Sequence, residues 1–563
     1  MKKAVNLLFI FVIFTVLFAL TGCQLNIPGR GISGVPEEEL ELAEIVPVEE
    51  WFLASDGLSV TVYEKNEEGI LVPSGTRFRG EKVQTQGDIL IQDGLSYAPL
   101  KDSEEKTYYL VSDLVKTIEE CVPETEKFVR TSATTYIDPN DCTIAGFIRK
   151  GAHLETIGFD FLKDGVVNMY RAKDDSGSEF WIFNKYLADT KEEADSVNTE
   201  FYEYNKDMVF SFDLYGGSPA NLDYFPYQSD LAVQKEMPSE CRTYYLNVAS
   251  VDAIDTYIDI CKTANANAIV LDIKDYSLAY PSGIAEEYSP AAYQSAYHDN
   301  ASYKAAIDKL KSEGIWTIGR IVVFNDPLFA EDNPDECIFD GGVNQGWPSA
   351  YSRKAWEYNV KLAVSAVEEM GFDEIQFDYV RFPESAYSMS KNGTADFKNT
   401  YDEEKAEAIQ NFCFYAADMI HRAGAYFSVD VFGECSDGYV TAYGQYWPAI
   451  SNIADAISSM PYIDHFGRDV DTWSDGYSTM NNWAQKAAAA QGITPNPALP
   501  RTWITCYAVP HWDPQIPVTD EFLTDQIRAL WDAGIGYGGF ITWNAASNTD
   551  VYYTVAPAFA REY

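Results

Sequence analysis

The 563-residue sequence is poor in basic side chains and contains only five histidines. Lys and Arg number 41 against 86 Asp and Glu, so the formal net charge is 41 − 86 = −45. Binding to a phosphate backbone needs clustered cations, so we expect no nucleic acid partner. The acidic balance suits a highly soluble surface whose ligand is neutral or weakly charged.

Several motifs of known chemistry are also missing. The histidines form no H-x-H pair, the cysteines form no C-x-x-C pair, and no G-x-S-x-G elbow is present. These absences argue against a metal-dependent barrel hydrolase and a serine hydrolase. We expect neither metal nor cofactor. Apart from Cys23, eight cysteines are scattered, mostly in apolar runs, and imply no disulfide framework.

Runs of apolar residues near membrane-spanning length are absent except at the N-terminus. Lys2 and Lys3 precede an apolar run from Ala4 to Leu20, which ends in Thr21-Gly22-Cys23. A basic start, an apolar segment and small residues describe a secretory signal, with a transmembrane anchor as the alternative. The tetrapeptide Leu20-Thr21-Gly22-Cys23 resembles a bacterial lipobox. We predict a signal peptide over residues 1–22 and lipidation of Cys23, which would hold the chain at the extracellular face of the cell membrane.

Two polar segments divide the rest of the chain. Residues 23–50 contain glycine and proline followed by seven glutamates, so we predict an extended acidic tether. Residues 191–240 are polar and rich in turn residues, and we predict an interdomain connector there.

Between these segments, short alternating apolar runs predict small all-β modules over residues 51–117 and 127–190. The two modules close on similar sequences, Tyr108–Val111 and Phe180–Phe183, each followed by a leucine. Together with Gly151–Gly158, the second module resembles a bacterial SH3-like module. The resemblance implies binding to the cell wall or to the neighbouring domain, and a structural spacer is the alternative.

From Cys241 onward, apolar strand-type runs alternate with helical stretches. This pattern suits a (β/α)8 TIM barrel over residues 241–563. A doubly wound open sheet is the alternative, but no G-x-G-x-x-G motif follows the first strand. The expected strands are Arg242–Val248, Ala268–Ile273, Trp316–Phe324, Glu374–Phe382, Tyr426–Phe432, Ala454–Met460, Arg501–Val509 and Tyr537–Trp543.

Carboxylates stand near the ends of these runs, where barrel active sites lie. Asp272, Asp378 and Asp430 each interrupt an apolar run, and a buried charge costs several kcal/mol unless it is paired. One interpretation is an ion-pair network with nearby cations. The other is a carboxylate pair that flanks a glycosidic bond. A Schiff-base lysine at Lys274 is less favoured, because neighbouring acids would keep it charged.

Four segments carry a family resemblance: Gly371–Pro383 (GFDEIQFDYVRFP), Val270–Asp275, Arg320–Asp326 and Ser428–Gly433. Through them, residues 242–556 resemble the glycoside hydrolase family whose barrel is a domain of unknown function related to α-amylase-type enzymes. The resemblance implies glycosidic hydrolysis. The sequence departs from the family at Met460–His465, where the order Pro-Met-x-Tyr-Pro-Ser is expected.

The resemblance also implies site residues. Asp378 corresponds to the strand 4 nucleophile, although Gln376 replaces the arginine that the α-amylase pattern has there. We prefer Asp430 as the acid, with Glu434 as the alternative, and retaining or inverting chemistry stays open. The predicted substrate-binding residues are Asp272, Lys274, Asp275, Arg320, Arg381, Tyr462, His465, Tyr507, Trp512 and Trp543.

These predictions describe a lipid-anchored extracellular glycoside hydrolase that acts on a cell-envelope or environmental polysaccharide. Two alternatives differ in class. One is a glycan-binding lipoprotein that has lost catalysis, and the other is a wall-attachment or scaffold protein that works through its β-modules.

Overall fold

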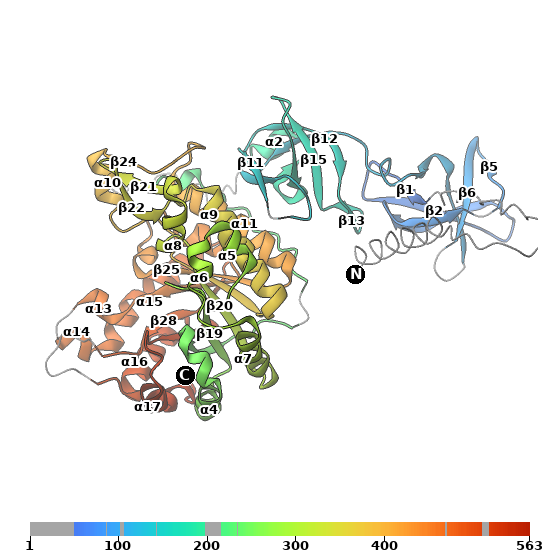
Figure 1. The fold of residues 1–563 in the computed structure, drawn as a ribbon. Coiled ribbons are helices and arrows are strands. Elements are labelled where there is room, and N and C mark those ends of the chain that lie inside the picture. The colour runs from blue at the N-terminus through green and yellow to red at the C-terminus, as the bar shows by residue number, and fades with distance from the viewer. Residues whose placement is uncertain are drawn as a thin grey trace, which may run out of the picture. The chain divides into compact units, whose positions relative to one another are not determined.

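The computed structural model describes residues 50–85, 87–101, 106–141, 143–196, 215–232, 235–467, 470–508 and 517–563 (Figure 1). The predicted signal peptide, Cys23 and the tether up to residue 49 lie outside the described residues, as does Trp512. Within the described ranges, no helix has both the length and the apolar character needed to cross a membrane.

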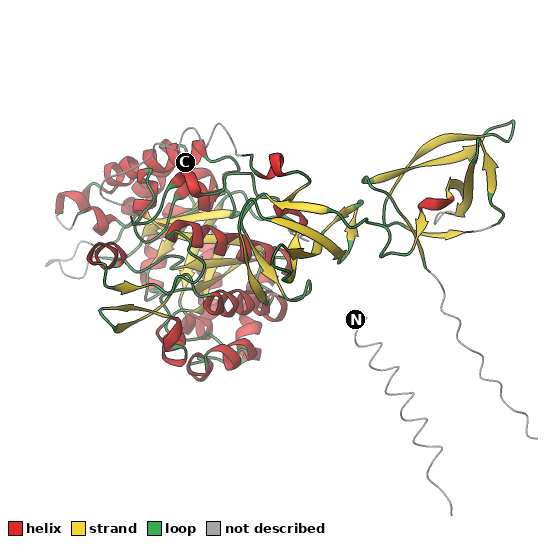
Figure 2. Ribbon diagram, turned by 90° about the horizontal axis from the view of Figure 1, so that it is seen from above, coloured by secondary structure: helices red, strands yellow, loops and turns green. Residues whose placement is uncertain are grey.

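The N-terminal region is all-β, as predicted (Figure 2). The first module pairs its strands in the order β3-β2-β7-β6-β4-β1-β8, with β5 beside β6. Its strands are β1 Trp51–Leu53, β2 Ser59–Lys65, β3 Leu71–Phe78, β4 Lys82–Thr85, β5 Leu90–Gln92, β6 Leu95–Lys101, β7 Thr107–Val111 and β8 Val115–Lys116.

The second module repeats this arrangement. Its order, β11-β10-β16-β15-β12-β9-β17, matches the first module strand for strand, apart from β5. In both modules the closing strand leads through one turn of 3-10 helix into a short last strand. The strands are β9 Glu126–Val129, β10 Ala133–Tyr136, β11 Ile144–Ile148, β12 His153–Phe159, β15 Met169–Asp174, β16 Glu179–Phe183 and β17 Leu187–Ala188, with a side hairpin β13 Leu162–Lys163 and β14 Val166–Val167. An SH3-like identity stays a prediction.

The C-terminal region is a parallel barrel-like sheet whose strands follow one another in sequence order. Its strands are β18 Cys241–Leu246, β19 Ala268–Lys274, β20 Trp316–Val322, β23 Glu374–Asp378, β25 Tyr426–Phe432, β26 Ala456–Met460, β27 Leu499–Pro500, β28 Thr502–Thr505 and β29 Gly539–Trp543. β27 pairs with β26 and β28 pairs with β29, and Arg501 alone separates them. The seventh strand is thus interrupted once. Its two halves form the two ends of the sheet, so the ring is nearly closed at this strand. This confirms a TIM-barrel-like domain and rules out an open, doubly wound sheet.

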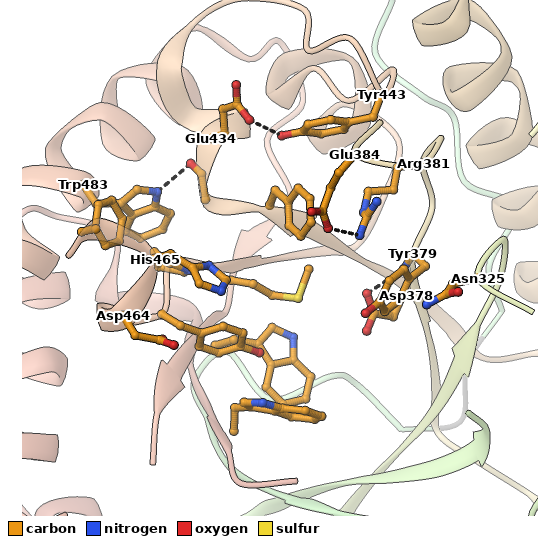
Figure 3. Close-up of a pocket in the computed structure, with 18 of the residues that line it drawn as sticks. Asn325, Asp378, Tyr379, Arg381, Glu384, Glu434, Tyr443, Asp464, His465 and Trp483 are labelled. Atoms are coloured by element: carbon orange, nitrogen blue, oxygen red, sulfur yellow. Dashed lines mark hydrogen bonds and ion pairs between the residues drawn. The ribbon is translucent and has the colours of Figure 1, made fainter. Parts of the chain in front are cut away.

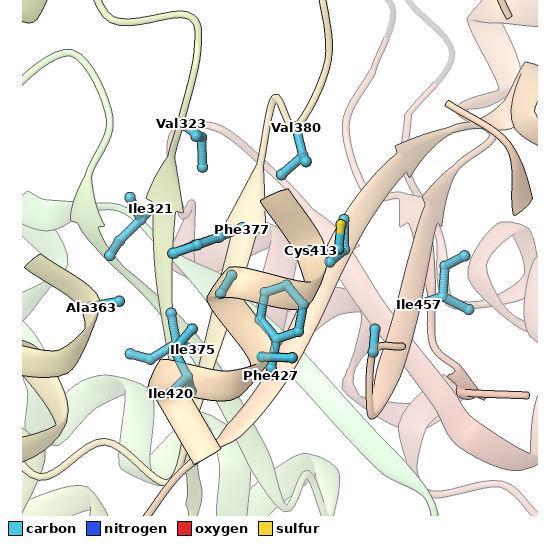
Figure 4. Packing of buried hydrophobic residues seen from close by; sticks show 14 of the residues in the cluster. Ile321, Val323, Ala363, Ile375, Phe377, Val380, Cys413, Ile420, Phe427 and Ile457 are labelled. Atoms are coloured by element: carbon cyan, nitrogen blue, oxygen red, sulfur yellow. The ribbon is translucent and has the colours of Figure 1, made fainter. Parts of the chain in front are cut away.

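Helices cover the outside of the ring. The longer helices are α4 Ile254–Ala264, α7 Asn300–Ser312, α9 Arg353–Ser365 with a π-helical turn Ala366–Met370, α11 Lys405–Ala423, α15 Gly476–Ile493, α16 Asp520–Asp532 and α17 Thr549–Phe559. Outward-facing strand residues such as Ile375 and Phe427 pack against α9 and α11 in the main hydrophobic core (Figure 4). Inward-facing residues are therefore left to fill the barrel and build its mouth.

Several short elements follow the carboxyl ends of barrel strands. A small antiparallel sheet joins β21 Cys337–Asp340, β22 Val343–Pro348 and β24 Ala395–Asp396. The short helices are α5 Gly283–Tyr288, α6 Pro290–Gln294, α8 Pro327–Asp332, α10 Ala386–Asn392, α12 Trp447–Ser451, α13 Ile463–Phe466 and α14 Val470–Ser474, and α2 Lys191–Ala194 follows the second module. Because connections after strand carboxyl ends build the top face of such barrels, the small sheet and α13 belong to its rim.

The second module shares a hydrophobic core with the barrel. Tyr136 of the module lies 6.1 Å from the Tyr415 ring of α11, and Tyr186 lies 5.7 Å from Phe414. Lys185 forms a 2.7 Å ion pair with the fully buried Asp418 of α11. α11 is consequently buried on its outer face as well as against the strands.

Candidate active site

Strand register brings four predicted polar residues to the inner face of the barrel. Asp272 lies opposite Arg320, and Phe377 lies opposite Val429, which places Asp378 and Asp430 at the same level on neighbouring strands. Because side chains alternate along a strand, the apolar residues between these polar ones face the helices. This alternation explains why single acids interrupt the apolar runs of the sequence.

Arg320 joins two of the carboxylates. Its Nη1 lies 2.7 Å from Asp272 Oδ1, and its Nη2 lies 2.6 Å from Asp378 Oδ2. Its Nε donates a second hydrogen bond to Asp378 Oδ2 at 3.2 Å. Burial alone would lower the pKa of Arg320, but the Asp378 and Asp272 carboxylates raise it well above its ordinary value. Arg320 is therefore a fixed cation that holds Asp378 in one orientation.

Asp272 is the more deeply held partner of Arg320. Tyr245 donates its hydroxyl to Asp272 Oδ2 at 2.5 Å, and the side chain does not line the cavity described below. Burial raises the pKa of Asp272 to about 6, although Arg320 lowers it. Asp272 thus braces Arg320 from inside the barrel rather than facing a ligand.

Asp430 is fully buried inside the barrel. Trp503 Nε1 donates to Asp430 Oδ1 at 2.7 Å, while Oδ2 has no hydrogen-bond partner among the described residues. Burial and then the charge of Asp378 raise the pKa of Asp430 well above its ordinary value. The side chain does not line the cavity, so its carboxyl lies behind the surface that a ligand would meet.

A cavity of about 1010 Å³ opens at the carboxyl ends of the strands (Figure 3). Asp378 lies on its wall, beside Asn325 and Tyr379. Nine of the residues predicted from sequence line this cavity: Asp275, Arg320, Asp378, Arg381, Glu434, Tyr462, His465, Tyr507 and Trp543. The site predicted from scattered segments is therefore largely one surface.

Lys274 was expected to bind a sugar, but its side chain does not face the cavity. The register of β19 shifts between Asp272 and Lys274, and this irregularity turns the lysine toward the helix layer. Its ammonium lies 4.8 Å from the ring of Tyr358 on α9 and pairs with Asp326. Burial lowers the pKa of Lys274. The residue supports the barrel wall and does not line the cavity.

Arg381 lies on the cavity wall among aromatic rings. Its guanidinium stands 4.1 Å from the Phe432 ring and 4.7 Å from the Tyr379 ring. It donates to the backbone oxygen of Phe382 at 3.1 Å and pairs with Glu384 at 3.3 Å. Burial lowers the pKa of Arg381. The arginine thus fixes the loop that follows Asp378.

Glu434 lies beyond the end of β25, in a 3-10 turn over Gly433–Asp437. Its two oxygens accept hydroxyl hydrogen bonds from Tyr439 at 2.5 Å and from Tyr443 at 2.8 Å. The carboxylate therefore faces the cavity with a donor already on each oxygen.

Aromatic rings cover one side of the cavity. Tyr462 stacks on Trp543, with ring centroids 6.3 Å apart and an interplanar angle of 26°. Tyr507 lies 6.2 Å from Tyr462 and donates its hydroxyl to Asp464 at 2.6 Å. His465, also in the cavity wall, is exposed. Tyr462 is buried and Tyr507 and Trp543 are half-buried, and flat rings in a cavity wall can stack on sugar faces.

Sequence reasoning missed several lining residues. Tyr276, 69% exposed, directly follows Asp275, and Tyr379 directly follows Asp378 with a left-handed φ of 55°. Their positions directly after predicted site residues could have identified both tyrosines. Trp483 lies on α15, and no sequence signal connects that helix with the cavity.

A metal site was not expected, and among the described residues no group of three or more His, Cys, Asp or Glu side chains is placed to hold a metal ion. The side chains that line the cavity supply carboxylates, arginines, phenols, aromatic faces, the imidazole of His465 and the ammonium of Lys486.

The sequence profile of the family described as "Putative glycosyl hydrolase domain" matches residues 243–549. A comparison with curated proteins finds no match. Many solved structures are similar, among them the following three. A hypothetical protein from Ruminiclostridium thermocellum is 29% identical over 33% of this chain and 97% of its own, with a TM-score of 0.28.

The PgaB (BpsB) glycoside hydrolase domain from Bordetella bronchiseptica is 12% identical over 56% of this chain and 99% of its own, with a TM-score of 0.41. The α-L-fucosidase isoenzyme 2 from Paenibacillus thiaminolyticus is 12% identical over 57% of this chain and 49% of its own, with a TM-score of 0.39. At these TM-scores the likenesses carry no argument about the cavity.

Proposed function

Because the chain belongs to the family of the glycosyl hydrolase profile that matches residues 243–549, we propose that its barrel hydrolyses glycosidic bonds of a polysaccharide. The observation that carries this proposal is Asp378. The carboxylate lies on the wall of a large cavity, held by two hydrogen bonds from Arg320.

Asp378 suits the step that glycoside hydrolysis requires at the anomeric carbon. Positive charge develops there in the transition state, and an oriented carboxylate stabilises it, attacks the carbon or activates a water. Arg320 supplies the orientation, since three of its nitrogens are bound to Asp272 and Asp378. Asp272 in turn keeps the guanidinium in place.

The cavity supports a polymeric substrate. Its volume of about 1010 Å³ lies at the upper end of the usual range for ligand pockets, roughly 300–1000 Å³. Tyr462, Tyr507 and Trp543 offer stacking faces, while acids and arginines around them offer hydrogen bonds to sugar hydroxyls. A polysaccharide of the cell envelope or of the environment fits these features.

The location is also a proposal. Lipidation at Cys23 would place the enzyme at the extracellular face of the membrane, with the acidic tether between lipid and modules. The packing of the second module on α11 supports a structural role for that module.

Sugar release tests the proposed activity. Residues 24–563 are incubated with α-glucans, β-glucans, amino-sugar polymers and purified cell wall, beside Asp378→Asn. Asp308→Asn is a matched control, because this carboxylate of α7 is 59% exposed and does not line the cavity. We expect release that disappears in Asp378→Asn and persists in Asp308→Asn. Tight binding of one polymer without any release would instead favour a non-catalytic glycan-binding protein.

A further inference from the structure

The carboxyl side chains around the cavity differ in what binds them. Six of them line the described cavity. Five have a side-chain donor: Asp378 has Arg320, Glu384 has Arg381, Glu434 has Tyr439 and Tyr443, Asp437 has Lys486, and Asp464 has Tyr507. The sixth, Asp275, accepts a hydrogen bond from the backbone N–H of Tyr276. A carboxyl that must carry and release a proton needs such a weakly bound position.

The backbone fixes Asp275 at the mouth of the barrel. It follows the last residue of β19, and its own N–H donates to the backbone oxygen of Ser277 at 3.1 Å. An antiparallel bridge between Lys274 and Leu278 closes the turn from the other side. The side chain is half-buried and shares the cavity wall with Asp378 and Arg320.

Asp275 and Asp378 differ in how Arg320 acts on each carboxyl. Burial raises the pKa of Asp275, and the Asp378 carboxylate raises it further, although Arg320 lowers it. Arg320 donates two hydrogen bonds to Asp378 but none to the side chain of Asp275. Two carboxyls in one cavity, of which Arg320 binds only one, can take two different roles in the reaction.

We propose that Asp275 is the proton donor of the glycosidic cleavage, a role that rests on the proposed function. Its carboxyl proton passes to the glycosidic oxygen as the bond from that oxygen to the anomeric carbon breaks, and the bonding pair leaves with the oxygen. In one course Asp378 bonds to the carbon, and a water then displaces Asp378 while its proton returns to Asp275. In the other, Asp378 takes a proton from a water that attacks the carbon directly, and Asp275 regains its proton from solvent. One water is consumed, and two hydroxyl ends are formed.

The two acids expected from the sequence are less suited to this step. Asp430 does not line the cavity, and Trp503 binds its Oδ1 from within the barrel. Glu434 lines the cavity, but each oxygen already accepts a tyrosine hydroxyl. A proton donor must reach the leaving oxygen within hydrogen-bond distance, which neither placement favours.

A leaving group that needs no proton tests the assignment. The substrates are the polymer cleaved by wild type and the glycosyl fluoride of the sugar released from it. For Asp275→Asn we expect kcat/KM on the polymer to fall by about 10²- to 10⁴-fold, the usual contribution of general acid catalysis. The kcat/KM for the fluoride should stay within about tenfold of wild type, since fluoride leaves without protonation. The alkaline limb of the pH profile on the polymer should disappear.

Two comparisons sharpen the result. Asp464→Asn removes another cavity carboxyl and should change polymer and fluoride cleavage by equal factors. Asp275→Glu keeps an acid and should retain the alkaline limb. Retained fluoride cleavage also shows that Asp275→Asn is folded.

The assignment is overturned if kcat/KM for the polymer and for the fluoride fall equally in Asp275→Asn while the variant keeps the unfolding midpoint of wild type. It is also overturned if the alkaline limb survives. Should Asp275→Asn fail to fold, loss of the limb in Asp275→Glu would overturn it. A wild type that cleaves neither substrate class would overturn the proposed function first, which separates the two failures.

Discussion

The ion pair between Lys185 and Asp418 should make a large contribution to stability. Asp418 is 0% exposed and Lys185 is 9% exposed, at a separation of 2.7 Å. The change Lys185→Met keeps the apolar stem and removes the charge. Asp418 then stays buried without a cation, and removing one partner of a buried pair typically costs about 3–5 kcal/mol.

The remaining donors decide where in this range the loss falls. Tyr227 donates to Asp418 Oδ1 at 2.7 Å and Tyr186 donates to Oδ2 at 2.8 Å, so the carboxylate keeps two hydrogen bonds. We therefore expect a loss of about 3 kcal/mol in the free energy of unfolding. The double variant Lys185→Met/Asp418→Asn should recover part of it, since no unpaired charge is then buried.

The measurement is urea unfolding of residues 24–563, followed by tryptophan fluorescence and circular dichroism. Lys191→Met is the control, because its pair with Asp195 is exposed at 62% and 52% and should contribute less than about 1 kcal/mol. A loss in Lys185→Met no larger than in this control would refute the reasoning. The pair would then be solvated, and the module would not be fixed to α11.

Three further predictions follow from the same structure. Arg320→Lys keeps one charge but cannot hold both carboxylates, so kcat for sugar release should fall about ten- to a hundredfold, the equivalent of one charged hydrogen bond. Burial raises the pKa of Asp272 to about 6, above the ordinary value of about 3.9, so the folded state binds a proton that the unfolded chain has released between these pH values. The free energy of unfolding should therefore fall by up to about 3 kcal/mol between about pH 4 and pH 6, and urea titrations of Asp272→Asn should show a flatter dependence. Cys23→Ser should abolish the attachment of a labelled fatty acid to the chain isolated from expressing cells, and labelling of the chain that persists would contradict lipidation at this residue.

The barrel could be predicted because each of its strands is recognisable from a short stretch of sequence. Buried parallel strands are apolar runs, so the run Tyr426–Phe432 coincides with β25 and the other strands begin within two residues of the expected positions. Asp272, Asp378 and Asp430 were identifiable because an acid inside such a run must be paired or functional. The same rule cannot tell which of them faces a cavity, since that depends on the loops above each strand.

Other features depend on backbone geometry that composition does not encode. The expected strand Glu374–Phe382 ends at Asp378, because Tyr379 adopts a left-handed conformation and turns the chain. The shift in β19 reverses the direction of Lys274. In contrast, the burial of α11 could have been predicted from the sequence. Its run from Phe412 to Tyr415 is apolar on more than one face, which is typical of a helix covered on both sides.

The covering of α11 has a consequence for how such chains can be recombined. A fragment over residues 241–563 would leave the outer face of α11, with Phe414 and Tyr415, open to water. Exposed apolar patches of that kind promote association between molecules. Gene fusions that exchange the second module for an unrelated domain should therefore fail. We expect the second module and the barrel to be inherited together as one unit.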